Sequence, residues 1–177
     1  MHNLYLGHAG SYSPAGVFQE YEDTSSVMGM ALEVMGSHAP ISFRGLSASQ
    51  ISQLQWLPAN EILQIQFDGV YQIASLSGNQ GVRAAQILKT GMQPLWLELR
   101  TTINQDVDIP AAQGFIDQGL FSLAQPGKVI GSILIKSDVE RPERAPWSSL
   151  LAIVEPGKSA STSRGIRIDV HPTVPGR

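Results

Sequence analysis

The sequence contains no cysteine, which excludes disulfide bonds, thiol catalysis and thiolate metal sites. Histidine and carboxylate side chains therefore remain as the available metal ligands. Charged residues are also scarce, at 15% of the chain against about 25% in typical soluble proteins. The 12 lysine and arginine residues are scattered, and no cluster of them could follow a phosphate backbone, so we expect no nucleic-acid partner.

Long hydrophobic runs are absent as well. No window approaches the ~20 apolar residues that a membrane-spanning helix needs, so we expect no membrane partner. Residues 1–10 lack the basic and apolar segments of a signal peptide. The sequence does contain 17 glycines and 11 prolines. With so little charge, this composition predicts many turns between short strands, and 177 residues suit one ordinary domain or two small ones.

Residues 47–57 carry the pattern of a helix. Ser47 is a favourable N-cap, and Gln50 three positions later completes a capping box. Pro58 cannot continue a helix, so we expect the helix to end just before it. The helical spacing predicts one apolar face, made of Ile51, Leu54 and Leu57.

From residue 61 onward the hydrophobic period changes to two, which is typical of strands. Residues 62–67 alternate, Asp68-Gly69 is a turn signal, and apolar residues follow at 70–73, so we expect a β-hairpin here. Regular spacing of the strands favours an antiparallel sandwich or barrel. Further strands are expected at residues 82–88, 95–100, 128–135, 150–154 and 166–170.

Two histidines, His2 and His8, stand six positions apart in the segment HNLYLGH. On a continuous α-helix this spacing would place them ~240° apart around the axis and ~9 Å apart along it. They can bind one metal ion only if the backbone turns sharply between them. Metzincin peptidases make this turn within the motif His-Glu-x-x-His-x-x-Gly-x-x-His, and His2 and His8 match its second and third histidines.

The segment resembles the gametolysin family of metzincin zinc metallopeptidases, in which an asparagine follows the second histidine as Asn3 does here. Residues 20–29, EYEDTSSVMG, are similar to the acidic loop and Met-turn of that family. Met28 matches the methionine that lies beneath the metal. The resemblance is sharpest over residues 2–29, and residues 53–57, 95–100 and 149–157 are similar to later segments of the family.

This resemblance implies a zinc metalloendopeptidase in which zinc is the cofactor and His2 and His8 are metal ligands. It also implies an extracellular protein whose partner is a peptide or protein substrate of the extracellular matrix or cell wall. The first histidine of the motif and the glutamate that acts as general base would precede Met1. The resemblance therefore implies a truncated chain with no catalytic residue of its own, which we expect to be inactive. Tyr5 stands where the family has its turn glycine.

We expect a mainly β fold with a small α/irregular N-terminal part. Residues 1–58 are interpreted as the C-terminal part of a metzincin-like catalytic domain, and residues 59–177 as an antiparallel β-sandwich-like domain. The alternative is a non-enzymatic β-sandwich binding module that carries a degenerate protease remnant, in which His2 and His8 bind nothing.

Several other polar residues are assigned structural roles. Glu98 and Arg100 stand two apart on an expected strand, so they share a face and are expected to pair. Glu20, Glu22 and Asp23 are interpreted as a solvated loop rather than a replacement catalytic base, with the alternative that one of them lies near the metal. His38 and His171 are interpreted as surface residues.

Overall fold

A computed structural model of the chain describes residues 6–13, 15–21, 23, 25–26, 28–29, 45–101, 131–139, 147–163 and 165–172. Within these residues the fold is mainly β with very little helix, which confirms the expected class at that level. No helix in the described part of the chain is long and apolar enough to cross a membrane.

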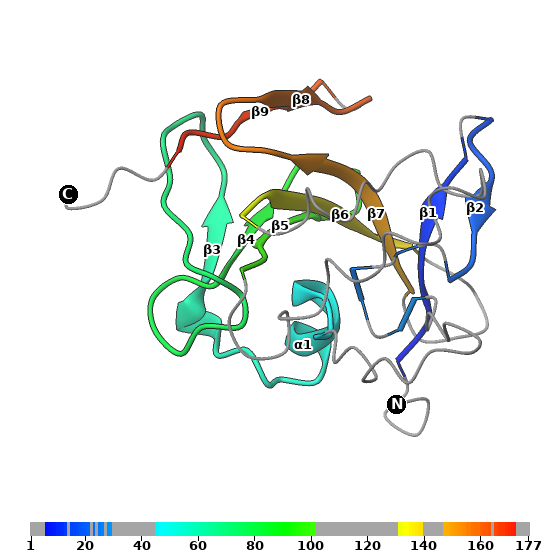
Figure 1. The fold of residues 1–177 in the computed structure, drawn as a ribbon, viewed down its shortest axis with the longest axis horizontal. Coiled ribbons are helices and arrows are strands. Elements are labelled where there is room, and N and C mark those ends of the chain that lie inside the picture. The colour runs from blue at the N-terminus through cyan, green and yellow to red at the C-terminus, as the bar shows by residue number, and fades with distance from the viewer. Residues whose placement is uncertain are drawn as a thin grey trace, which may run out of the picture.

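The described strands form one mixed seven-stranded sheet, in the order β2-β1-β7-β6-β5-β4-β3, and a separate two-stranded sheet, β8-β9 (Figure 1). The β1–β7 and β3–β4 pairs are parallel, whereas the other neighbours are antiparallel. The strands are β1 (Ala9–Tyr12), β2 (Phe18–Gln19), β3 (Ile62–Ile65), β4 (Ala84–Ile87), β5 (Leu95–Leu99), β6 (Ile133–Val139), β7 (Trp147–Val154), β8 (Ser159–Ser161) and β9 (Arg167–Asp169).

Strands from both sides of residue 58 share this sheet, because β1 pairs in parallel with β7. The expected division at residue 58 stays a prediction. The strands expected at 82–88, 95–100, 150–154 and 166–170 correspond to β4, β5, β7 and β9. The strand expected at 128–135 lies partly outside the described residues, and β6 runs beyond it to Val139.

The expected hairpin at residues 62–73 is wrong. Strand β3 ends at Ile65 and pairs in parallel with β4, which follows it only after a long connection. The apolar residues after the turn do not form a buried strand face, since Phe67 and Val70 are 78% and 88% exposed. The Tyr71 hydroxyl instead donates to the Phe67 carbonyl at 2.8 Å, which closes the loop on itself.

The helix begins as the sequence predicts. Helix α1 spans Ala48–Gln53, and Ser47 caps it with both hydrogen bonds of the capping box present. It ends four residues before Leu57, because Gln55 takes a left-handed backbone conformation with φ 58°. A short 3₁₀ turn, η2 (Ala59–Glu61), leads into β3.

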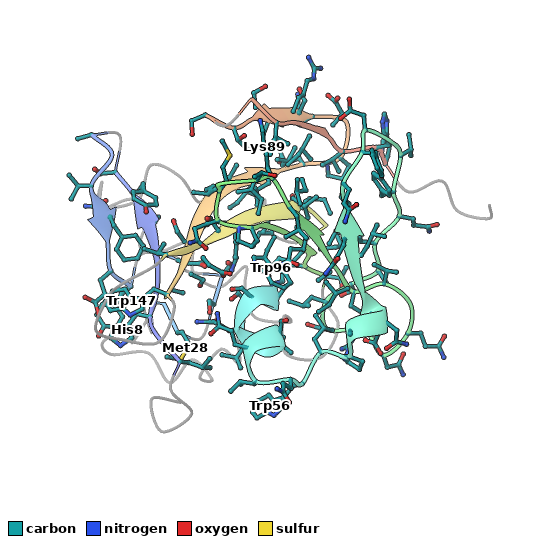
Figure 2. The ribbon with its side chains drawn as sticks, turned by 180° about the vertical axis from the view of Figure 1, so that it is seen from behind. His8, Met28, Trp56, Lys89, Trp96 and Trp147 are labelled. Carbon is teal, nitrogen blue, oxygen red and sulfur yellow. The ribbon has the colours of Figure 1, made fainter. Side chains whose placement is uncertain are left out.

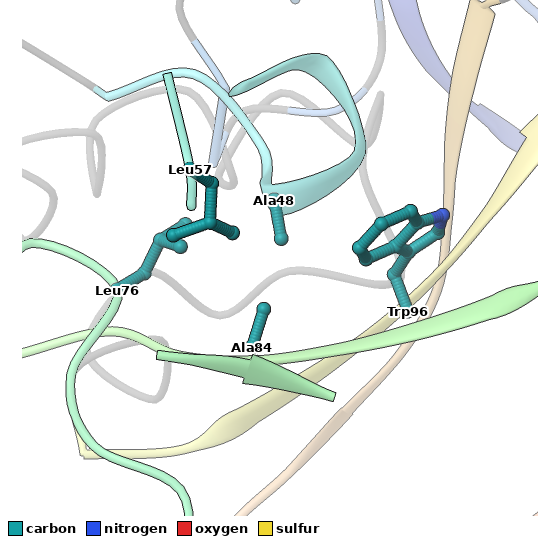
Figure 3. Close-up of a cluster of buried hydrophobic side chains, with 5 residues drawn as sticks. All are labelled: Ala48, Leu57, Leu76, Ala84 and Trp96. Carbon is teal, nitrogen blue, oxygen red and sulfur yellow. The ribbon is translucent and has the colours of Figure 1, made fainter. Parts of the chain in front are cut away.

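Side chains of the central strands alternate between two covered faces of the sheet, as the pleat requires. Helix α1 covers one face, where Ala48 packs with Leu57, Leu76, Ala84 and Trp96 (Figure 3). Strands β8 and β9 cover the opposite face. There, Ala160 and Ile168 pack against the cluster Ala85, Leu97, Ile135 and Val154.

Leu57 is 4% exposed, whereas Leu54 is only partly buried, so the two leucines of the predicted apolar face differ in how firmly they are packed. We expect Leu57→Ala to lower the free energy of unfolding by about 2–5 kcal/mol, as the loss of a core leucine does. The matched control Leu54→Ala should cost clearly less. Urea denaturation of both variants measures this, and equal costs would contradict the packing described.

Candidate functional site

The described histidine of the predicted pair, His8, lies directly before β1 and is 9% exposed. Its Nδ1 contacts the carboxylate of Glu20, and its Nε2 lies 3.1 Å from the hydroxyl of Tyr21. The His8 ring is 4.1 Å from the Tyr21 ring and 5.2 Å from the Trp147 ring, measured between centroids. Figure 2 shows His8 next to Trp147 at one end of the sheet.

The two contacts fix the roles of the His8 nitrogens. A carboxylate oxygen only accepts, so in the neutral imidazole Nδ1 carries the proton and donates to Glu20. Nε2 then presents its lone pair to the Tyr21 hydroxyl. A histidine held by a carboxylate on one nitrogen has the orientation and tautomer of a typical metal ligand. Glu20 was expected to be solvated, and its side chain is 36% exposed while it contacts His8.

A tight fold of β2 over β1 brings Glu20 and Tyr21 to His8. The two strands pair antiparallel, with Ser11 opposite Gln19. A Cβ atom at Gly10 would overlap the Gln19 carbonyl oxygen and the Phe18 ring, so only glycine allows this close approach. Glu20 and Tyr21, which follow β2, therefore come into contact with the His8 ring.

Met28, the predicted methionine of the Met-turn, lies in the cluster beside this strand. It is 5% exposed and packs with Leu6, Ala9 and Leu46, against which α1 places Ile51. The Ala9 N–H donates to the Met28 carbonyl at 2.8 Å, so the turn is bonded to the residue that follows His8. The structure thus brings His8 and Met28 into one neighbourhood. His2, the other predicted ligand, lies outside the described residues.

A fully buried network of charged side chains contacts the segment that leads to Met28. The Lys136 ammonium lies 2.8 Å from Asp23 Oδ2 and 3.1 Å from Glu98 Oε1. Arg100 donates to the same Glu98 oxygen through Nη2 at 2.8 Å and Nε at 3.1 Å. The expected Glu98–Arg100 pair is confirmed, but the expectation that Asp23 is solvated is wrong. Asp23 is drawn into the core because buried Lys136 needs a counter-charge.

Helix α1 connects this network to the His8 strand. The Ala48 N–H, at the first turn of the helix, donates to Glu98 Oε2 at 2.6 Å. Gln50 accepts from the Ser26 hydroxyl at 3.0 Å and donates to the Gly7 carbonyl at 3.3 Å. A single buried side chain therefore spans the Met28 segment and the residue before His8.

Sequence reasoning did not single out Tyr21, Trp147 or Lys136. A signal for Lys136 is present in hindsight, since it interrupts an otherwise apolar strand beside Ile135. No comparable signal marks Tyr21. Within the described residues no group of three or more histidine, cysteine, aspartate or glutamate side chains could hold a metal ion. His171 is exposed as expected, and His38 lies outside the described residues.

Comparisons with known proteins give no further assignment: no family model, curated protein or solved structure matches this chain.

Lys136→Met tests the buried network. The substitution keeps the length of the side chain but leaves two buried carboxylates, Asp23 and Glu98, without their shared cation. We expect a loss of about 3–5 kcal/mol in the free energy of unfolding, as for other broken buried ion pairs. The control Lys158→Met removes an exposed lysine and should change stability by less than ~0.5 kcal/mol. Comparable losses in the two variants, measured by chemical denaturation, would contradict the structure.

Glu98 gives the protein a specific acid sensitivity. Burial raises the pKa of Glu98, but the charges of Arg100 and Lys136 outweigh this effect and lower it from 4.5 to about 2. The ionised form is thus favoured in the folded state, and its stabilisation is complete above pH 4.5. As the pH falls from 4.5 towards 2, roughly 3 kcal/mol should be lost.

The measurement is urea denaturation at several pH values for the wild type and Glu98→Gln. The variant should be less stable near neutral pH and should show a flatter decline below pH 4.5. A parallel decline in both proteins would remove Glu98 as the cause.

Proposed function

We propose that the chain is part of a zinc metalloendopeptidase of the gametolysin type, and that His8 is one of its metal ligands. The observation that carries the proposal is the environment of His8: a buried imidazole, bonded to the Glu20 carboxylate through Nδ1, next to the Met28 turn. This arrangement agrees with the roles that the resemblance implies for His8 and Met28. The proposed substrate is a protein of the extracellular matrix or cell wall, and the proposed location is extracellular.

The described residues fit a zinc site in part. His8 offers Nε2 as a nitrogen ligand, and Glu20 holds the other nitrogen in the protonated form that ligation through Nε2 requires. Trp147 packs at 5.2 Å from the imidazole and shields that side of it from water. Because a zinc site needs three or four protein ligands, His2 is proposed as a second one.

Zinc bound there would polarise the scissile carbonyl and acidify an attacking water. The residues of the chain would position the metal through His8 and hold the histidine against the sheet through Met28. None of the positions that match the family pattern supplies the general base. General-base catalysis typically contributes 10²–10⁴-fold to the rate, so we expect the chain alone to cleave no peptide.

The proposal extends to the domain organisation. Residues 1–58 are assigned to the C-terminal part of a metzincin-like catalytic domain, and residues 59–177 to a β-sandwich-like domain. The support for this division is the family resemblance over residues 2–29 together with the mainly β character of the described residues.

Zinc titration of the full chain by calorimetry tests the proposal. We expect His8→Gln to weaken zinc binding at least tenfold, since it removes a nitrogen bonded to the metal, and losing a side chain that only orients a ligand already costs about 10–100-fold. The control His171→Gln changes an exposed histidine and should bind zinc as the wild type does. Equal affinity of His8→Gln and wild type would refute the proposal and favour the non-enzymatic binding module.

A further inference from the structure

We propose that Asp138 is a proton-controlled switch in the sheet beside His8: folding favours the protonated form of its carboxyl group, and ionisation of that group weakens the end of the β6–β7 pairing. Asp138 is the last residue but one of β6. The inference concerns the fold and does not depend on the proposed function.

The two carboxyl oxygens of Asp138 have different surroundings. Oδ2 accepts from the Trp96 indole N–H at 3.2 Å. Oδ1 is buried and has no hydrogen-bond partner in the described part of the protein. Ser148 lies directly opposite Asp138 on β7, and its hydroxyl is also buried without a partner, so it does not donate to Oδ1. A buried oxygen without a donor disfavours a negative charge on the carboxyl group.

This environment gives the titration of Asp138 a definite direction. Burial raises the pKa of Asp138 above its usual value of 3.8, and hydrogen bonds from Trp96 and Ser49 offset this effect only in part. The folded protein therefore keeps the proton to a higher pH than the unfolded chain does. Stability falls as the pH rises above 3.8 and levels off once the folded protein has also lost the proton. The direction is opposite to that of Glu98.

The charged side chains of the neighbouring strands are bonded to other groups. Lys136 shares the face of β6 with Asp138, two positions earlier, but its ammonium binds Asp23 and Glu98. Arg100, directly after β5, binds Glu98 as well. These four charges therefore balance one another and leave Asp138 outside their network.

The other elements packed around Asp138 add no compensating charge. Helix α1 and strand β7 contain no charged residue. The titratable group on the β1 side is His8, whose Nδ1 is already bonded to the Glu20 carboxylate. Within the described residues, an ionised Asp138 therefore has no cation to balance it.

The pairing at Asp138 affects the segment that carries His8. The last two pairs of the β6–β7 ladder are Asp138 with Ser148 and Val139 with Trp147. The Ser148 N–H donates to the His8 carbonyl at 3.2 Å, and the Trp147 ring lies 5.2 Å from the imidazole. A charge that destabilises this end of the ladder therefore loosens the backbone that holds His8.

The first test follows the Trp96 indole N–H of the full chain by NMR from acid to neutral pH, with Trp96→Phe to assign the resonance. Because this N–H donates to Asp138, we expect its resonance to shift with a midpoint above pH 3.8. The shift should be absent from Asp138→Asn. It should persist in the control Asp169→Asn, which changes an exposed carboxylate. A midpoint at or below 3.8 in the wild type would overturn the inference, whether or not the variants fold.

The second test compares Asp138→Asn, a neutral group of the same shape as the protonated acid, with the wild type. In urea denaturation, the difference in stability should move in favour of the variant as the pH rises above 3.8. At neutral pH, the Ser148 N–H should exchange with deuterium more slowly in the variant. A stability difference that is constant with pH, or Ser148 exchange that is equal or faster in the variant, contradicts the proposed switch.

Discussion

The rest of the described structure depends on one buried cation. Lys136 lies in the middle of β6 with no exposed surface, and an ammonium group removed from water costs several kcal/mol unless carboxylates compensate it. Glu98 compensates it from the neighbouring strand, and Asp23 does so from the segment that leads to Met28. The requirement for charge balance therefore draws an irregular segment of the chain into the core and holds it against the sheet.

Hydrogen bonds connect this charge network to the candidate site. Asp23 accepts from the Ser25 N–H at 3.0 Å, and Met28 is bonded to Ala9, the neighbour of His8. Because such a network leaves few alternative arrangements that satisfy every charge, we infer that it serves the uniqueness of the local fold more than its net stability. The buried charges of this network thus help to position the imidazole without contacting it, in addition to the Glu20 carboxylate that contacts it directly.

Local features of the fold could be predicted from the sequence, and long-range features could not. The cap of α1 could be predicted because Ser47 and Gln50 interact within one turn of the helix. The Glu98–Arg100 pair could be predicted because the two residues share one face of a strand. The Asp23–Lys136 pair joins segments that are distant in the sequence, and no local pattern encodes it. The prediction of a hairpin at residues 62–73 was wrong because exposed apolar residues there have the same alternating pattern as a half-buried strand. Tyr21 was missed because its contact depends on a positive φ angle.

The parallel pairing of β1 with β7 has a consequence for the order of folding. Strand β1, which directly follows His8, precedes β7 by most of the described sequence, yet it can join the sheet only when β7 and Trp147 are present. Contacts of such high sequence separation form slowly, since a long loop must close first. The contacts of this segment with β7 and Trp147 can therefore form only after β7 has been synthesised, and until then the imidazole has only its local partners, Glu20 and Tyr21.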